Sequence, residues 1–199
     1  MIQKETGVAE NTEISETKKS YVSDQLAEKT WSVVARDLHE GGSLIVLQKA
    51  WDSNNKEFVI FPSYSGQDPD AIKPDVWMSW RHELKPPLAG HTRIRDFAEV
   101  VTTIPVQSAG AIARIENEQA LTRAEATRRY HSGEPGLVAL VLRVYHLSRT
   151  YKFTDVSNNE GDAHFVPLPF DVELADLIPA VDDDDFERRL AAIKAAIGP

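Results

Sequence analysis

The chain of 199 residues is 42% hydrophobic and contains no cysteine. Its length fits one compact domain with its own core, and the lack of cysteine excludes disulfide frameworks, thiolate metal sites and cysteine nucleophiles. The net charge is −9, but residues 72–150 carry 11 basic and 8 acidic side chains, whereas residues 151–199 carry 4 and 11. A protein this acidic does not coat nucleic acid in bulk, so any contact with phosphate requires a local basic surface.

The first half of the chain begins with polar residues. Residues 1–22 have few large apolar side chains, which predicts a flexible polar tail ahead of a single domain over residues 23–199. Apolar side chains then recur at helical spacing between Asp24 and Leu38, which predicts a helix that faces the core and ends at the following glycines. The longest apolar run of the chain, residues 136–142, is far shorter than the roughly 20 residues of a membrane-spanning helix.

Two short runs rich in β-branched and aromatic residues follow the predicted helix. Residues 43–49 and 57–61 are separated by the turn formers of residues 52–55, and this pattern predicts a β-hairpin. Residues 63–92 form a long polar connection with several prolines. Connections of this length are uncommon in compact domains, so the stretch is either functional or contains a helix that the pattern does not place.

The second half contains the clearest patterns. Residues 97–106 read as a strand that could pair with residues 111–115, and residues 163–168 read as a shorter strand. Residues 137–147 are almost continuously apolar, as expected of a central strand covered on both faces.

Two helices are predicted here. Thr122 and Glu125 have the spacing of a capping box at the start of an arginine-rich helix that runs to about His131. Apolar residues at helical spacing after Asp182 predict a C-terminal helix whose acidic first turn complements the helix dipole. This order lacks a regular strand–helix alternation, so we expect an α+β fold: a single domain with a mixed, largely antiparallel sheet flanked by N- and C-terminal helices.

Sequence motifs with an established chemistry are absent. The chain has no phosphate-binding glycine loop, no dinucleotide-binding fingerprint, no nucleophile elbow and no calcium-binding loop. His39-Glu40 and His82-Glu83 lack a second histidine at the spacing of a zinc protease. The motifs therefore predict no catalytic residue, no metal site and no cofactor, and they leave open whether the protein is an enzyme.

A few charged and polar residues have unusual positions. Arg143 interrupts the apolar run of residues 137–147, so it needs an acceptor in an internal ion pair or lines an anion pocket. Lys49 ends the first apolar strand, where it either extends to solvent or contacts phosphate. Tyr64 and Gln67 follow Pro62, where they either line a pocket or stabilise a turn.

These residues belong to a longer pattern. It contains Trp31, Val34, Leu38 and Gly41, Leu47-Gln48-Lys49, residues 58–64 with Gln67, Arg129-Tyr130, and residues 140–147. The pattern resembles the domain of unknown function 1802 family, a group of uncharacterised bacterial and archaeal proteins. The resemblance implies no known reaction or ligand. Some members are linked with restriction-endonuclease-like domains, which implies an association with nucleic-acid processing or defence. The sequence itself has no apolar stretch of signal-peptide or membrane-spanning length, so we expect a cytoplasmic location away from membranes.

The leading hypothesis is a non-catalytic accessory module that binds nucleic acid. Lys49, Arg129 and Arg143 would contact phosphate, while Tyr64, Gln67 and Tyr145 would orient or stack on bases. The first alternative is an enzyme or binder for a small molecule bearing phosphate or carboxylate, with Arg143 and Lys49 on the anion and His146 or His164 as general base. A further alternative is a protein-interaction domain that uses its acidic C-terminal surface.

The spatial arrangement of Lys49, Tyr64, Gln67 and Arg143 discriminates between these hypotheses. One deep pocket that contains all four residues favours a small ligand, and an open arginine-lined face favours nucleic acid. If the four residues are dispersed, they form neither a small-ligand pocket nor a nucleic-acid-binding face.

Overall fold

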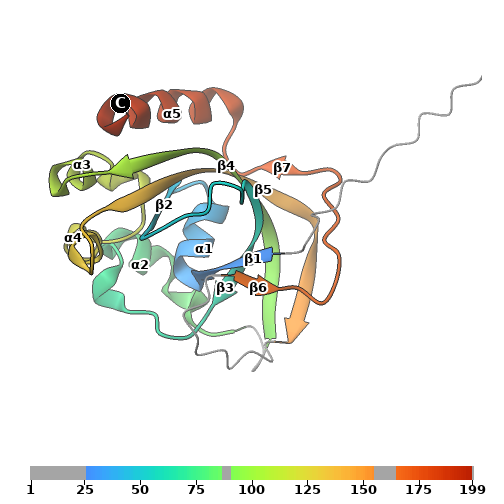
Figure 1. The fold of residues 1–199 in the computed structure, drawn as a ribbon. Coiled ribbons are helices and arrows are strands. Elements are labelled where there is room, and N and C mark those ends of the chain that lie inside the picture. Colours follow the sequence, from blue (N-terminus) through green and yellow to red (C-terminus); the bar gives the residue numbers. More distant parts are fainter. Residues whose placement is uncertain (1–25, 87–90, 155–164, 199) are drawn as a thin grey trace, which may run out of the picture.

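The computed structural model describes residues 26–86, 91–154 and 165–198 (Figure 1). The expected tail over residues 1–22, and His164, lie outside these ranges. Within them the strands are β1 (Leu26–Trp31), β2 (Ile45–Gln48), β3 (Glu57–Ser63), β4 (His91–Val106), β5 (Leu137–Thr154), β6 (Phe165–Pro167) and β7 (Ile178–Pro179). The α-helices are α1 (Ser32–His39), α2 (Pro74–Trp80), α3 (Ala109–Arg114), α4 (Arg123–His131) and α5 (Asp183–Ile197), and short 3₁₀ turns are η1 (Pro69–Ala71), η2 (Arg81–Leu84) and η3 (Glu116–Glu118).

The strands form one mixed sheet in the order β2-β5-β4-β3-β1-β6, with β7 paired to β5. The pairing of β1 with β3 is parallel, and the other pairs between named strands are antiparallel. The predicted α+β fold with a largely antiparallel sheet is therefore confirmed. No helix in the described ranges has the length and apolarity required to cross a membrane.

Helix α1 packs inside the curve of the sheet, and α5 lies across its outer face (Figure 1). Leu38 of α1 belongs to one cluster of buried side chains with Phe58, Ile60 and Leu142 of the sheet. Val141 of β5 points to the opposite face and joins the cluster that contains Phe186 and Leu190 of α5. Strand β5 is thus buried on both faces, as its continuous apolar sequence predicts.

Three predictions of local structure were wrong, two because distant strands supplied the hydrogen-bond partners and one because a local cap starts a helix. The predicted helix from Asp24 begins only at Ser32, since residues 26–31 form β1 between β3 and β6. The predicted hairpin does not form, since β2 pairs with β5 while β3 pairs with β1 and β4. Residues 111–115 belong to α3 and its C-cap, because the Ser108 hydroxyl accepts from the Ala111 N–H and starts a helix.

The N-cap residues of α4 and α5 were predicted correctly, although the Glu125 side chain bonds Arg128 and Arg129 and does not complete a capping box. The Thr122 hydroxyl accepts from the Glu125 N–H at 3.3 Å at the start of α4. The Asp182 carboxylate accepts from the Asp185 N–H at 2.9 Å at the start of α5. Residues 63–92 are not a structureless connection, because they contain η1, α2 and η2.

Arg189 holds α5 against the loop that follows α1. Its guanidinium bonds the Glu118 carboxylate at 2.7 Å and the carbonyls of Gly41 and Gly42 at 2.7 and 2.8 Å. Gly41 has a φ of +70°, and a Cβ built there would lie 2.5 Å from Cγ2 of Val181. The close approach of these two segments therefore requires glycine at position 41.

Candidate functional site

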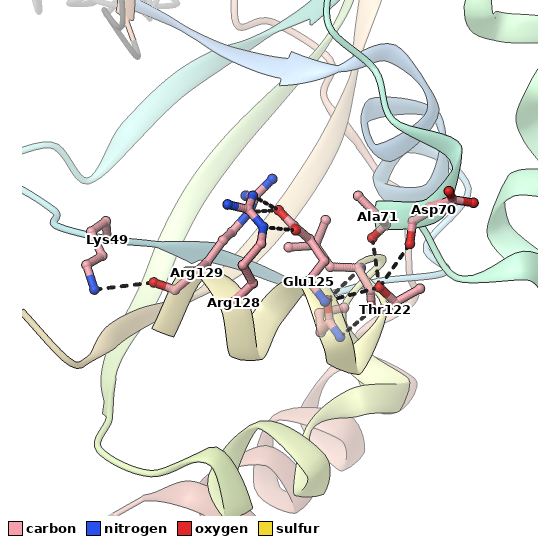
Figure 2. A network of polar contacts seen from close by, with 9 residues as sticks. Lys49, Asp70, Ala71, Thr122, Glu125, Arg128 and Arg129 are labelled. Atoms are coloured by element: carbon pink, nitrogen blue, oxygen red, sulfur yellow. Dashed lines mark hydrogen bonds and ion pairs between the residues drawn. The ribbon is translucent and has the colours of Figure 1, made fainter. Parts of the chain in front are cut away.

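The structure does not gather the sequence-predicted binding residues into one site. Lys49 lies beside the end of α4, where its Nζ donates to the carbonyls of Arg129, Tyr130, Glu134 and Gly136. Figure 2 shows the contact with the Arg129 carbonyl. The lysine ammonium adds a hydrogen-bond donor to carbonyls at and just beyond the end of α4, and its charge complements the negative end of the helix dipole.

Gln67 and Tyr64 contact different parts of the fold. Oε1 of Gln67 accepts from the Ser32 hydroxyl and the Val33 N–H, both at 3.2 Å, at the beginning of α1. Tyr64 borders a separate cavity of about 150 Å³ with Arg93, Arg95 and other polar residues. Burial, together with the nearby charge of Glu83, raises the pKa of the Tyr64 hydroxyl.

Arg143 and Tyr145 lie further along β5. Arg143 is buried, forms an ion pair with Asp183 and lies 4.4 Å from the ring centroid of Phe186, so it fastens the first turn of α5 to the sheet. The Tyr145 ring lies 6.2 Å from the ring of Phe97, its partner on β4. Lys49, Tyr64, Gln67 and Arg143 are therefore dispersed, and the single site drawn from the sequence does not form.

Arg129 does border a cavity. A half-open cavity of about 140 Å³ lies between β1, β2, the beginning of α1 and residues 119–121. The polar and aromatic residues that line it are Glu28, Lys29, Thr30, Trp31, Gln48, Gln119 and Arg129. The cavity is small, and it combines an aromatic ring, a carboxyl group, an amide and a cation.

The curvature of the sheet creates this cavity. Strands β1 and β2 are not neighbours in the sheet, yet the Gln48 amide on β2 donates to Oε1 of Glu28 on β1. Thr30, two residues along the same face of β1, donates to Oε2 of Glu28 at 3.4 Å. The Glu28 carboxyl therefore joins two strands that the sheet brings together only by curling.

Glu28 has an unusual protonation equilibrium. Its side chain is fully buried, and this burial raises its pKa from 4.5 to about 7, although the hydrogen bonds from Thr30 and Gln48 act in the opposite direction. At neutral pH a large fraction of the carboxyl groups is protonated. A protonated carboxyl can donate as well as accept a hydrogen bond.

Two adjacent arginines of α4 share the carboxylate of Glu125 (Figure 2). Arg128 donates to both oxygens of Glu125 at 2.7 and 2.8 Å, and Nε of Arg129 donates to Oε1 at 2.7 Å. The Arg129 guanidinium carbon lies 5.3 Å from the centroid of the Trp31 ring, within the range of a cation–π contact. Of the two arginines, only Arg129 borders the cavity. Its side chain is 33% exposed and therefore also reaches solvent, whereas that of Arg128 is 71% exposed.

A second polar cluster lies where α1 ends. Nδ1 of His39 lies 2.7 Å and Nδ1 of His146 lies 3.0 Å from the same Oδ1 of Asp96. Burial alone would raise the pKa of Asp96, but the hydrogen bonds and charges of His146 and His39 together outweigh it and lower the pKa.

Sequence analysis singles out Arg129 and His146, but it misses the residues that accompany each of them, for identifiable reasons. Trp31 and Gln48 belong to the family pattern but were not selected as ligand contacts, and Glu28 fell within a predicted helix. The sequence of β1, Leu-Ala-Glu-Lys-Thr-Trp, does not alternate between apolar and polar residues, so no strand pattern marked Glu28. No spacing rule connects His39, Asp96 and His146, which are 57 and 50 residues apart in pairs.

Comparison with known proteins gives a family but no activity. No curated protein matches the sequence. Crystal structures of ASCH from Zymomonas mobilis resemble the chain: a mutant form has a TM-score of 0.45 at 10% identity, covering 85% of this chain and 98% of that one. The unsubstituted protein has a TM-score of 0.43 at 9% identity, covering 84% and 94%. The model of the family described as Domain of unknown function (DUF1802) matches residues 27–192, and the chain therefore belongs to this family.

Proposed function

We propose that this domain is a non-catalytic accessory module that binds single-stranded nucleic acid and receives one base in the cavity beside Trp31. The observation that carries the proposal is the convergence of Glu28, Trp31, Gln48 and Arg129 on one cavity of about 140 Å³. An apolar cavity of about 150 Å³ in another protein holds one benzene molecule. The size therefore suits a single aromatic ring, and the open side leaves room for the attached sugar.

The lining offers the interactions that an unpaired base uses. An indole ring supports stacking with little dependence on base identity, and such stacking contributes about 1–3 kcal/mol per base. The amide of Gln48 and the carboxyl of Glu28 supply donors and acceptors for a base edge. Because the pKa of Glu28 is about 7, its carboxyl can act in either sense near neutral pH.

Arg129 supplies the positive charge for the phosphate that accompanies the base. Its guanidinium borders the cavity and is partly exposed. Ion pairing with the Glu125 carboxylate fixes its orientation, so little conformational entropy is lost on binding. A double-stranded ligand would keep its bases stacked and would gain only the phosphate contacts.

Arg128 and Arg129 form a matched pair for the test. We expect a fluorescein-labelled single-stranded oligonucleotide to bind the wild-type chain, as followed by anisotropy, with an affinity that falls as salt rises. Arg129→Ala should weaken this binding by about tenfold. Arg128→Ala removes an arginine from the same carboxylate but not from the cavity, and it should change the affinity less than about twofold.

The result that contradicts the proposal is equally specific. Equal losses in the two folded variants would assign the binding to general surface charge. The absence of single-strand binding at low salt would remove nucleic acid as the ligand of the cavity. Stronger binding of duplex than of single strand would contradict the insertion of an unstacked base.

A small anion beside Tyr64 is the second candidate. Its cavity of about 150 Å³ is bordered by Lys85, Arg93 and Arg95, with Glu83 as a counter-charge. A hydroxyl whose pKa is raised stays protonated and can donate to an anion. Titration calorimetry with inorganic phosphate tests this site: Arg93→Ala should abolish any heat of binding, and unchanged heat would place the anion elsewhere.

A further inference from the structure

The His39–Asp96–His146 cluster is built from three separate elements. Asp96 on β4 and His146 on β5 are direct register partners across the antiparallel ladder, so their side chains share one face of the sheet. One pair further along that face, Ala98 and Val144 pack beneath α1. His39 is the last residue of α1. Its ring therefore reaches Asp96 and His146 at the edge of the apolar contact between α1 and the sheet.

The backbone holds the three side chains firmly. The ladder between β4 and β5 shifts register between Ile94 and Asp96, and such an irregularity re-aims a side chain relative to a regular strand. The Asp96 carboxyl is 7% exposed, whereas the imidazoles of His39 and His146 are 20% and 29% exposed. The carboxylate is therefore enclosed while the two rings remain accessible to solvent.

The distances suit one shared cation. The three candidate ligand atoms lie within 4.8 Å of one another, and the two N···O distances are 2.7 and 3.0 Å. Metal–nitrogen and metal–oxygen bonds of about 2.0–2.2 Å, with ligand–metal–ligand angles of about 90–110°, place adjacent ligand atoms about 2.8–3.6 Å apart. Small movements of the two rings, whose centroids are 4.1 Å apart, would open the required space.

The donor set also fits the charge of a cation. Two neutral imidazoles and one carboxylate carry a single negative charge, which is partly neutralised by hydrogen bonds when no cation is bound. Imidazole nitrogen with carboxylate oxygen is the ligand set of zinc and of other divalent first-row transition metals, and three protein ligands leave positions for water or a further ligand.

We propose that His39, Asp96 and His146 bind one divalent transition-metal ion, through an imidazole nitrogen of each histidine and a carboxylate oxygen. The site is distinct from the cavity beside Trp31, because it shares none of the residues that line that cavity. It therefore stands independently of nucleic-acid binding.

Zinc binding to the full chain tests this site. After treatment with a chelator and removal of the chelator, we expect the wild-type chain to bind one equivalent of Zn²⁺ by titration calorimetry, with a dissociation constant in the micromolar range or below. His39→Ala and His146→Ala should each weaken the binding at least a hundredfold. His82→Ala, which removes an imidazole that is 63% exposed and outside the cluster, should leave it unchanged.

Folding of each variant is checked by circular dichroism. If a variant does not fold, the histidine ring-nitrogen resonances of the wild-type chain replace it as the readout, and Zn²⁺ should move those of His39 and His146 and no others. Failure of the folded wild-type chain to bind Zn²⁺ saturably overturns the proposal. Binding that persists in both folded variants, or that moves other histidine resonances instead, also overturns it.

Discussion

Replacement of Glu28 by glutamine should remove a large part of the pH dependence of stability. The pKa of Glu28 is raised from 4.5 to about 7 by burial in the folded state. Between these values the folded protein holds a proton that the unfolded chain has released, so the free energy of unfolding falls as the pH rises. Below pH 4.5 both states are protonated, and the full stability is present.

The size of the effect follows from the shift. Each pKa unit corresponds to 1.36 kcal/mol, so the shift corresponds to about 3 kcal/mol of stability lost between pH 4.5 and pH 8. Glutamine has nearly the same shape, stays neutral and keeps an oxygen for the Gln48 amide. The stability of Glu28→Gln relative to wild type should therefore increase by about 3 kcal/mol from pH 4.5 to pH 8.

Urea denaturation at several pH values measures this difference directly, provided that the m-value is the same in both proteins. Glu57→Gln is the matched control, because Glu57 is an exposed glutamate on β3. Its stability curve should run parallel to that of the wild type. Parallel curves for Glu28→Gln as well would refute the reasoning, because they would mean that Glu28 titrates alike in the folded and unfolded states.

Three further substitutions test the packing around the candidate sites by urea denaturation. Gly41→Ala should destabilise the fold by at least about 1 kcal/mol more than Gly133→Ala, because both glycines have a positive φ but only the first lies against another segment. Equal losses would refute this. Lys49→Ala should lower the free energy of unfolding by about 1 kcal/mol and leave oligonucleotide affinity unchanged, because the ammonium group bonds carbonyls near the end of α4. A loss of affinity without destabilisation would instead support the phosphate contact predicted from the sequence. Arg143→Ala should lower the free energy of unfolding by about 2 kcal/mol and loosen α5. Arg188→Ala, which removes an exposed arginine of the same helix, should lower it by less than about 0.5 kcal/mol. Similar losses in the two variants would contradict the anchoring role of Arg143.

Local signals in the sequence predicted the elements that depend on local interactions. The beginnings of α4 and α5 can be predicted from Thr122 and Asp182, whose side chains accept hydrogen bonds from backbone N–H groups three residues ahead. The apolar strand around Arg143 predicts that its guanidinium needs an acceptor, and Asp183, an exposed residue at the start of α5, supplies one. These interactions are encoded within a few residues or by a single charge in an apolar strand.

Non-local pairing accounts for what the sequence did not reveal. The apolar spacing between Ala27 and Leu38 suits a helix, yet Ala27 belongs to β1, because β3 and β6 supply its hydrogen-bond partners. The cavity beside Trp31 requires β1 and β2 to meet through the curl of the sheet, which no local pattern specifies. Lys49 is a candidate by residue type and position alone, and the pattern gave no sign that its ammonium donates to backbone carbonyls near the end of α4.

The most direct test of the central claim is a nuclear magnetic resonance titration of the ¹⁵N-labelled chain with a single-stranded oligonucleotide. The indole N–H of Trp31 and the side-chain amide of Gln48 report on the cavity, and the indoles of Trp77 and Trp80 serve as internal references outside it. Base insertion predicts saturable shifts of the Trp31 and Gln48 resonances with little movement of the references. Saturable binding that leaves the Trp31 and Gln48 resonances unmoved would contradict the claim.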